Sequence, residues 1–345
     1  MRKQRGFHWL RPVLLAAGGV LSAAASLPAQ AATTLVINQL LPPGDPFNQQ
    51  VLRPWAKDVE RVTDGRVRIS LPNAPMAGPA QLWNAVSGDI VDGAYVFNGL
   101  FPRQLPLEQV AALPFISGTA AATSVALWKT HEKFFARAPE YRGVKLLALF
   151  SLPPGEVFSM AKPIVHPGDL RGRRIWALPG VPQRVLVHSH AGVISSPAVQ
   201  VSELVAGGTV DAVAGIGDYN ARAFKILGYM KSETVIPGGL TVPSFSLILN
   251  RGKWDSIAPA DRKAIEAISG LAFARRMTLI TRINQQAREQ ARKQGLQILQ
   301  ASPALMAEFK GYAKPLFTQW LASARAMHVD GPAALKYFEA QAQAH

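Results

Sequence analysis

The stretch that decides the fold reads TTLVINQLLPPGDPF at residues 33–47 and continues as NQQVLRPWAKDVERVTDGRVRISLPN at residues 48–73. Its first part is a short apolar strand that runs into a Pro/Gly turn. Its second part predicts a helix that ends at Asp64-Gly65, followed by a strand in which apolar and polar residues alternate. Together they predict one β-α-β unit, whose helix rests on apolar residues at helical spacing: Phe47, Val51, Leu52, Trp55, Val59 and Val62.

The same alternation continues along the chain. A helix that ends at Gly88 precedes a strand at 94–97, and a helix at about 120–136 precedes a strand at 144–152. A second series of strands and helices begins at Arg174. Strands that alternate with helices indicate mainly parallel sheets covered on both faces, and two such series predict two α/β lobes.

The C-terminal part is predicted to be mostly helical. After a strand at 242–250, a long helix starts after Pro259 and is capped by Gly295. Proline favours the first turn of a helix, and glycine favours the position just after its end. The last 45 or so residues read as further amphipathic helix.

The first 31 residues have the pattern of a secretory signal peptide. A positive start at Arg2, Lys3 and Arg5 leads into an apolar run and then into Ala29-Gln30-Ala31, which fits a cleavage site. The apolar run is shorter than the roughly 20 residues that span a bilayer. We therefore expect cleavage near Ala31 and export to the periplasm as a soluble protein.

The chain is basic, with a formal net charge of +15 over 345 residues. Removal of residues 1–31 deletes four cations and no acid, which leaves +11. A basic balance suits nucleic acid, an anionic membrane surface or acidic ligands. Because the charges are spread along the chain and export separates the protein from nucleic acid, we expect no nucleic-acid partner.

The sequence lacks the usual motifs for catalysis and metal binding. It has no cysteine, which excludes thiol nucleophiles, thiolate metal sites and lipid attachment through an N-terminal cysteine. It also has no G-x-S-x-G, H-E-x-x-H or phosphate-loop motif. His188 and His190 lie about 200° apart on a helix, so they cannot chelate one ion. We predict a protein that is not an enzyme and uses no cofactor or metal.

Two α/β lobes without catalytic equipment are typical of a binding protein that closes around a small molecule. Ligands of open α/β sheets bind at the carboxyl ends of the strands. Two lobes that face each other place these strand ends around one cleft.

Five segments, in this order and spacing, resemble one known family. They are PPGDPFNQQ at 42–50, AQLWNAVSGDIVDGAYVFNGLFPRQLPLEQVAALPF at 80–115, KPIVHPGDLRGRRI at 162–175, GTVDAV at 208–213 and LILNRGKWDSIAP at 247–259. They are similar to the DctP family, the extracytoplasmic solute-binding proteins of TRAP transporters. The resemblance covers essentially all of residues 33–330.

The resemblance implies a two-lobed fold like that of periplasmic binding proteins, with mainly parallel sheets, flanking helices and a long helix that spans both lobes. The strands at 144–152 and 242–250 would cross between the lobes, and the spanning helix would begin near Pro259. The expected lobes are residues 32–147 with 242–275, and residues 148–241 with 276–345. The expected partners are a small organic solute and the small and large membrane subunits of a TRAP transporter, which a monomeric binding protein would serve.

Two positions depart from the family pattern. Relatives grip an organic acid through the Arg of a K-I-R motif, and the matching residue here is Trp176. Arg174 stands at the position of the Lys. Relatives also use an Asn on the ligand, and it matches Gly215, which has no side chain.

These departures leave two interpretations of the ligand open. In the first, a carboxylate is held by another cation, such as Arg103, Lys162 or Arg222. In the second, the ligand is less acidic, or is aromatic or cationic; it stacks on Trp176, and Glu156 is available to a positive group.

The candidate ligand-binding residues are chosen by their position at predicted strand ends. They are Gly44, Asp45, Asn73, Phe97, Asn98, Ser151, Glu156, Trp176, Pro179, Ile216 and Phe245. Two other functions compete with this interpretation. A secreted α/β enzyme requires an acid, a base or a nucleophile clustered in the cleft, and an orphan periplasmic sensor or adaptor would bind a non-carboxylate ligand with the same fold.

Overall fold

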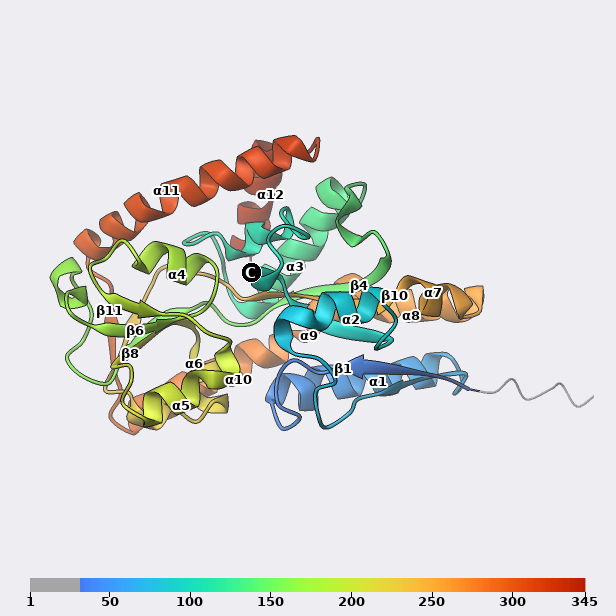
Figure 1. Ribbon diagram of the computed structural model, residues 1–345, viewed down its shortest axis with the longest axis horizontal. Helices are drawn as coiled ribbons and strands as arrows, with labels where there is room; N and C mark the ends of the chain where they lie inside the picture. The colour runs from blue at the N-terminus through green and yellow to red at the C-terminus, as the bar shows by residue number, and fades with distance from the viewer. Residues whose placement is uncertain (1–31, 345) are drawn as a thin grey trace, which may run out of the picture. The chain divides into compact units, whose positions relative to one another are not determined.

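The computed structural model describes residues 32–344, so the predicted signal peptide lies outside the described residues. Two β-sheets with surrounding helices make up this part of the chain (Figure 1). We call the sheet with the order β2-β1-β3-β10-β4 and its helices lobe 1, and the sheet with the order β11-β9-β5-β8-β6-β7 and its helices lobe 2. The strands are β1 (Thr33–Asn38), β2 (Val67–Ser70), β3 (Gly93–Phe97), β4 (Val144–Ser151), β5 (Glu156–Ser159), β6 (Arg174–Ala177), β7 (Gly192–Ile194), β8 (Ala212–Ile216), β9 (Ser232–Val235), β10 (Ser244–Asn250) and β11 (Gln297–Gln300).

Both sheets are mainly parallel, as expected, and each is mixed because it contains one strand of reversed direction. In lobe 1, β1 is parallel to β2 and β3, whereas β10 is antiparallel to β3 and β4. In lobe 2, β5 is antiparallel to β8 and β9, whereas the other neighbours are parallel. The two reversed strands are β5 and β10, and each directly follows a short segment that crosses from one sheet to the other.

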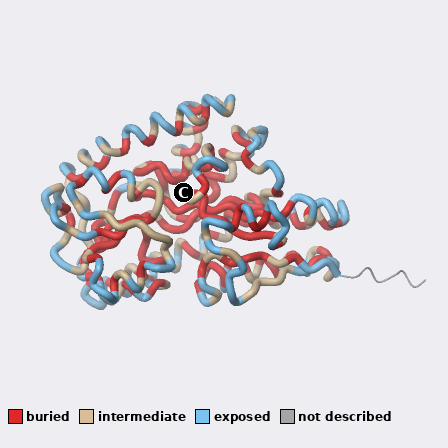
Figure 2. The backbone as a smooth tube through the Cα atoms, viewed as in Figure 1, coloured by how far each residue is buried: buried red, intermediate tan, exposed pale blue. Residues whose placement is uncertain are grey.

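Helices surround the sheets, and the central strands β3, β5, β8 and β10 are buried throughout, whereas the edge strands β7 and β11 are largely accessible (Figure 2). In lobe 1, α1 packs on β2 and α8, and α3 packs on β4, α9 and α12. In lobe 2, α10 packs on α6 and α11 on α4. The helices are α1 (Arg53–Val62), α2 (Leu82–Ser87), α3 (Ala120–Thr130), α4 (Val181–Leu186), α5 (Val201–Ala206), α6 (Asp218–Ala223), α7 (Arg251–Ser256), α8 (Pro259–Ile268), α9 (Gly270–Arg276), α10 (Thr278–Lys293), α11 (Pro303–Ala326) and α12 (Gly331–Gln343).

The first β-α-β unit forms as its sequence predicts. One π-helical turn at Asn48–Leu52 leads into α1, and the helix buries Phe47, Trp55 and Val59 completely. It ends where Asp64 and Gly65 adopt positive φ angles of 47° and 77°. Glycine tolerates this left-handed backbone without strain, which explains the stop.

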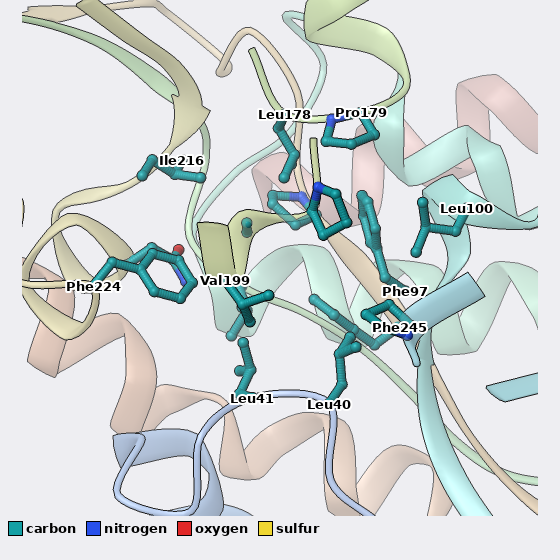
Figure 3. Close-up of a pocket in the computed structure, with 16 residues that line it drawn as sticks. Leu40, Leu41, Phe97, Leu100, Leu178, Pro179, Val199, Ile216, Phe224 and Phe245 are labelled. Carbon is teal, nitrogen blue, oxygen red and sulfur yellow. The ribbon is translucent and has the colours of Figure 1, made fainter. Parts of the chain in front are cut away.

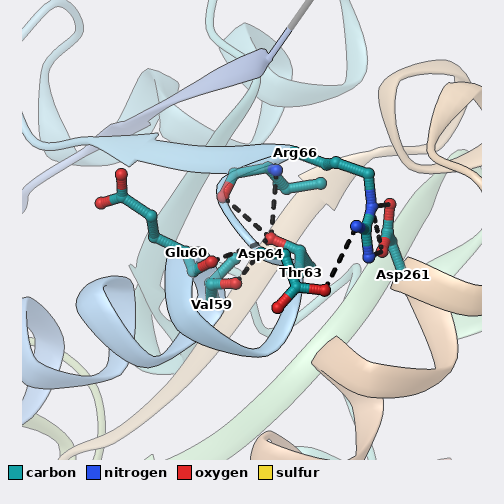
Figure 4. Close-up of polar contacts among 7 residues, drawn as sticks. Val59, Glu60, Thr63, Asp64, Arg66 and Asp261 are labelled. Atoms are coloured by element: carbon teal, nitrogen blue, oxygen red, sulfur yellow. Dashed lines mark hydrogen bonds and ion pairs between the residues drawn. The ribbon is translucent and has the colours of Figure 1, made fainter. Parts of the chain in front are cut away.

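The turn after α1 is tied to α8 by an arginine (Figure 4). The guanidinium of Arg66 donates from Nε and Nη2 to the carboxylate of Asp261, with the Nη2 to Oδ1 distance at 2.8 Å. Arg66 Nη1 also reaches Asp64 Oδ2 at 3.3 Å. Thr63 Oγ1 donates to the Val59 carbonyl at 2.8 Å and so closes the last turn of α1. Two segments almost 200 residues apart are thereby fixed to one another.

The long helix expected from Pro259 is in fact three helices, α8, α9 and α10. The first break lies at Ser269, whose backbone is extended, and at Gly270, whose φ is +52°. A Cβ atom on Gly270 would lie 2.5 Å from the ring of Trp128, so the close packing of α9 on α3 requires glycine here. Trp55 Nε1 donates to Ser269 Oγ at 3.2 Å and holds the break in place.

The chain passes between the lobes in two neighbouring segments, 152–155 and 236–243. They are hydrogen-bonded to each other through Gly155 N–H to Thr241 O and Leu240 N–H to Gly155 O, both at 2.8 Å. A third passage is the junction of α9 and α10 at Met277. The two expected crossing strands are thus β4 and β10, which pair side by side in lobe 1.

The C-terminal helices are present as expected, but β11 precedes them and was not predicted. Helix α11 starts beside lobe 2, and α12 then packs on α3 of lobe 1 (Figure 1). The lobe boundaries stay a prediction, with α12 lying against the part of the chain assigned to lobe 1.

Candidate functional site

A partly enclosed chamber lies between the two sheets, at the carboxyl ends of their parallel strands. Leu40 and Leu41 follow β1, Leu178 and Pro179 follow β6, and Val199 comes from the segment after β7. The strand-end position is where open α/β sheets bind ligands. Figure 3 shows these side chains reaching the chamber from both lobes.

The chamber contains about 580 Å³ of space not filled by atoms, of which about 50 Å³ is far enough from the walls to hold the centre of a water molecule. The second volume corresponds to roughly three to five waters, which is about the size of one aromatic ring with a small substituent. Sixteen residues form the wall: Leu40, Leu41, Pro79, Phe97, Leu100, Leu152, Leu178, Pro179, Pro197, Ala198, Val199, Ile216, Asn220, Phe224, Pro243 and Phe245.

Stacked aromatic rings support the lobe 1 wall. Phe97 and Phe245 face the chamber with ring centroids 5.5 Å apart. Phe245 stacks on Phe150 at 5.2 Å, and Phe150 stacks in turn on Phe47 at 4.5 Å. Offset stacking of this kind adds to the stability that burial gives. The two rings at the chamber therefore rest on the fully buried core of lobe 1.

The lobe 2 wall carries neither of the polar groups that the family pattern contains. Trp176 is fully buried in the core beneath the wall, and its Nε1 donates to Ser196 Oγ at 3.1 Å. At Gly215, whose φ is +92°, a Cβ atom would lie 2.5 Å from Pro182 Cγ. The space for a side chain at that position is therefore occupied by proline.

One polar side chain remains in the wall. Asn220, on α6, is 3% exposed, and its Oδ1 is buried without a hydrogen-bond partner in the described chain. The other fifteen wall residues carry only hydrocarbon side chains. The site is thus an apolar chamber with a single amide.

Four of the eleven predicted residues line this chamber, namely Phe97, Pro179, Ile216 and Phe245. Asn73 lies in a second, wider hollow that shares Leu40, Leu41, Pro79 and Val199 with the chamber; about 530 Å³ of it can hold the centre of a water molecule, against about 50 Å³ in the chamber. Gly44 is exposed and lines neither hollow.

The predicted residue Asp45 forms a polar link between the lobes instead of lining the chamber. The hydroxyl of Tyr219, on α6, donates to Asp45 Oδ1, and the Phe47 N–H donates to the same carboxylate oxygen at 2.8 Å. Both Asp45 and Tyr219 are almost completely buried. Burial raises the pKa of Asp45, against the opposing effect of these two hydrogen bonds. Tyr219 precedes Asn220, so this link is adjacent to the chamber.

Two other predicted polar residues are buried within lobe 1, where their side chains are hydrogen-bonded to other parts of the protein. Asn98 binds Ser244 Oγ at 3.1 Å and accepts from Ser246 Oγ at 2.8 Å. Ser151 donates to the Ala120 carbonyl at 3.1 Å. Their side chains stabilise the sheet, because they satisfy polar groups that have no access to water.

The predicted residue Glu156 belongs to a buried cluster beside the crossing segments. Arg288, on α10, donates to Glu156 at 3.1 Å, to Asp218 at 2.9 Å and to Glu233. Burial raises the pKa of Glu156 to about 7 and that of Glu233 to about 9. Three acids share one arginine, so protons must neutralise part of the negative charge. Glu156 is thus already paired within the protein.

No lysine, arginine or histidine is among the wall residues, and the suggested cations Arg103, Lys162 and Arg222 are exposed. Among residues 32–344, no group of His, Asp and Glu side chains is placed to hold a metal ion. Within the same range, no helix has the length and hydropathy needed to cross a bilayer.

The sequence reasoning missed most of the apolar wall. Leu40, Leu41 and Leu178 lie just after the ends of β1 and β6, so the strand-end rule could have found them had it not favoured polar residues. Asn220 lies on α6 and Phe224 directly follows this helix, which was not predicted, so the sequence left no signal that the two residues face the same space.

Two lobes, crossing segments and a chamber at the strand ends define a binding protein that encloses a small solute. The model of the family "Bacterial extracellular solute-binding protein, family 7", or DctP, matches residues 37–323, and the chain belongs to this family. This membership confirms the resemblance, and it identifies the chain as a solute-binding protein and not an enzyme.

A curated relative from Comamonas testosteroni, the "Outer membrane transporter protein TsaT", is 39% identical over 326 residues, which cover 94% of this chain and 96% of the relative. Among solved structures, a TRAP periplasmic solute-binding protein of Bordetella bronchiseptica with bound (R)- and (S)-mandelate superposes with a TM-score of 0.84. It is 29% identical, and the match covers 90% of this chain and 99% of that one. A marine metagenome TRAP protein described as specific for aromatic acids matches with a TM-score of 0.80 at 24% identity, covering 90% and 99% of the two chains. These matches confirm the two-lobed fold.

Proposed function

We propose that the chain is the periplasmic binding subunit of a TRAP-type importer and that it captures an aromatic acid by closing its lobes. The observation that carries the proposal is the apolar chamber, in which Phe97 and Phe245 offer ring faces at the strand ends. Enclosure of a ring by such walls removes apolar surface from water on all sides.

The acid part of this proposal rests on relatives, because the Bordetella protein is described with mandelate bound. We propose that the ring occupies the chamber while the carboxylate lies toward the neighbouring hollow that contains Asn73. In this arrangement the carboxylate keeps contact with water, so binding of the ring does not require the free energy of removing the charge from water.

A neutral aromatic solute is the second candidate, and the specific observation in its favour is the wall without a lysine, arginine or histidine. An isolated carboxylate inside such a wall would be strongly disfavoured. The two candidate ligands differ in charge, but both have an aromatic ring that would occupy the chamber.

Isothermal titration calorimetry of the chain without residues 1–31 separates these candidates. The probes are benzoate with benzamide, phenylacetate with 2-phenylacetamide, and pyroglutamate as an acid without an aromatic ring. We expect the aromatic acids to bind more tightly than both their amides and pyroglutamate. Tighter binding of the amides would favour the neutral solute, and preferential binding of pyroglutamate would contradict the aromatic proposal altogether.

The proposed export and partners follow from the family and from the N-terminal pattern. We propose that cleavage near Ala31 releases a monomer to the periplasm, where it delivers the solute to a small and a large membrane subunit. Mass spectrometry of the protein from the periplasmic fraction tests the first step, because cleavage there yields a chain that begins at Ala32.

A further inference from the structure

The geometry points to Asn220 as the residue that sets ligand specificity inside the chamber, where its amide oxygen accepts a hydrogen bond from a hydroxyl or amino group on an aromatic ligand. This inference rests on the proposed function and deepens it. It adds a required hydrogen-bond donor to the aromatic ring as a property of the solute.

The first observation is the unpartnered oxygen itself. Asn220 Oδ1 is buried in a wall whose other side chains are all hydrocarbon. Leaving a buried polar group unsatisfied costs about 1–3 kcal/mol, and buried polar atoms in folded proteins almost always have partners. Since the described wall offers no donor side chain, a ligand is the natural source of one.

The second observation is that Asn220 is held in place from both sides. Its predecessors on α6 are anchored to α10, because Arg288 donates to Asp218 at 2.9 Å and the Tyr219 N–H donates to Asn284 Oδ1 at 2.8 Å. The Tyr219 hydroxyl is bound to Asp45 of lobe 1. Asn220 therefore cannot move away from the chamber without breaking contacts in both lobes.

Closure and recognition are thereby coupled through neighbouring residues. Tyr219 contacts lobe 1, whereas Asn220 lines the chamber. A ligand that satisfies Asn220 favours the position of α6 in which Tyr219 meets Asp45. When a ligand offers no donor to the amide oxygen, the closed state still carries the free-energy cost of a buried acceptor without a hydrogen bond.

The test compares ligands that differ by one hydroxyl. Mandelate and phenylacetate, and 3-hydroxybenzoate and benzoate, are titrated calorimetrically into the wild-type chain and into Asn220→Leu, a variant of similar size without the amide. In at least one of the two pairs, the wild type should bind the hydroxylated ligand roughly 5- to 100-fold more tightly than the ligand without the hydroxyl. Asn220→Leu should remove most of this preference, and it should bind the ligand without the hydroxyl at least as tightly as the wild type does.

The control is Asn84→Leu, the same substitution at an exposed position of α2 outside the chamber wall, which should keep the preference. Asn220→Ser retains an oxygen on a shorter side chain and covers the case in which Asn220→Leu fails to fold. If the preference in Asn220→Leu, or in Asn220→Ser where Asn220→Leu does not fold, stays within twofold of the wild-type preference, the inference is overturned. Equal binding of each pair by the wild type would also overturn it, while binding of no aromatic probe at all would instead contradict the proposed function.

Discussion

At the residue scale, the Asp45–Tyr219 contact is the clearest polar link between the lobes. Removal of the Tyr219 hydroxyl leaves the carboxylate of Asp45 buried with only the Phe47 N–H as donor to it. The loss of one partner of a buried polar pair costs about 1–3 kcal/mol. This contact forms only when α6 lies against the 42–47 turn, so its loss acts on the closed state.

We predict that Tyr219→Phe weakens the binding of whichever aromatic probe the wild type binds by roughly 5- to 100-fold, measured by calorimetry. Tyr229→Phe is the matched control, because Tyr229 is 50% exposed and its hydroxyl lies at the surface. Unchanged affinity in Tyr219→Phe would show that the contact contributes nothing to closure around the ligand.

Individual site residues were predictable only where their position at a strand end is enough to place them in the chamber wall. Phe97, Pro179, Ile216 and Phe245 were found because a strand end faces the cleft whatever its side chain. The sequence could not reveal that Asp45 and Glu156 already have protein partners, because Tyr219 and Arg288 lie more than 130 residues away in the chain. For Trp176, the sequence left both a pocket position and a core position open, and the structure places the indole in the core.

At the scale of elements, the Arg66–Asp261 pair joins the α1–β2 turn to the start of α8. Asp261 is almost buried and receives a bidentate contact, whereas the nearby Arg68–Glu60 pair is about half exposed at both ends. Exposed ion pairs contribute little, while a bidentate contact to a buried carboxylate contributes more.

We therefore predict that Arg66→Met lowers the melting temperature by a few degrees and that Arg68→Met leaves it nearly unchanged. Thermal unfolding followed by circular dichroism at low and high salt measures both. Equal effects of the two substitutions would contradict the structural role given to Asp261.

Element boundaries show what local sequence can and cannot predict. Asp64-Gly65 ends α1 as predicted because the turn is a local backbone property. The break between α8 and α9 was not predicted, since it depends on Trp128 packing against Gly270 and on Trp55 binding Ser269. The mainly parallel sheets were predicted, but the one reversed strand in each, β10 and β5, was not, because the local pattern of a strand does not contain its direction.

At the scale of the whole molecule, the cluster around Arg288 makes stability depend on pH. Burial raises the pKa of Glu156 to about 7 and that of Glu233 to about 9, whereas both groups titrate near 4.5 in the unfolded chain. The folded chain therefore binds more protons than the unfolded chain between these values. Stability from this cluster is fully present below pH 4.5 and is lost as pH rises through the folded pKa values.

We predict that Glu233→Gln reduces the fall in melting temperature between pH 5 and pH 9, measured by differential scanning calorimetry. Glu289→Gln, on the same helix as Arg288, should leave that slope unchanged, because its hydrogen bond to Arg292 lowers the pKa of Glu289 below 4.5. A slope in Glu233→Gln as steep as that of the wild type would contradict the assignment.

The central claim is that the chamber between the strand ends holds the solute, and filling it tests that claim most directly. Ala198 lies in the wall, and Ala206 is an exposed residue of α5 in the same segment. Calorimetric titration of mandelate or benzoate into Ala198→Trp should show binding at least 100-fold weaker than in the wild type, while Ala206→Trp should bind like the wild type. Binding of the same ligand to Ala198→Trp with wild-type affinity would show that the solute lies elsewhere.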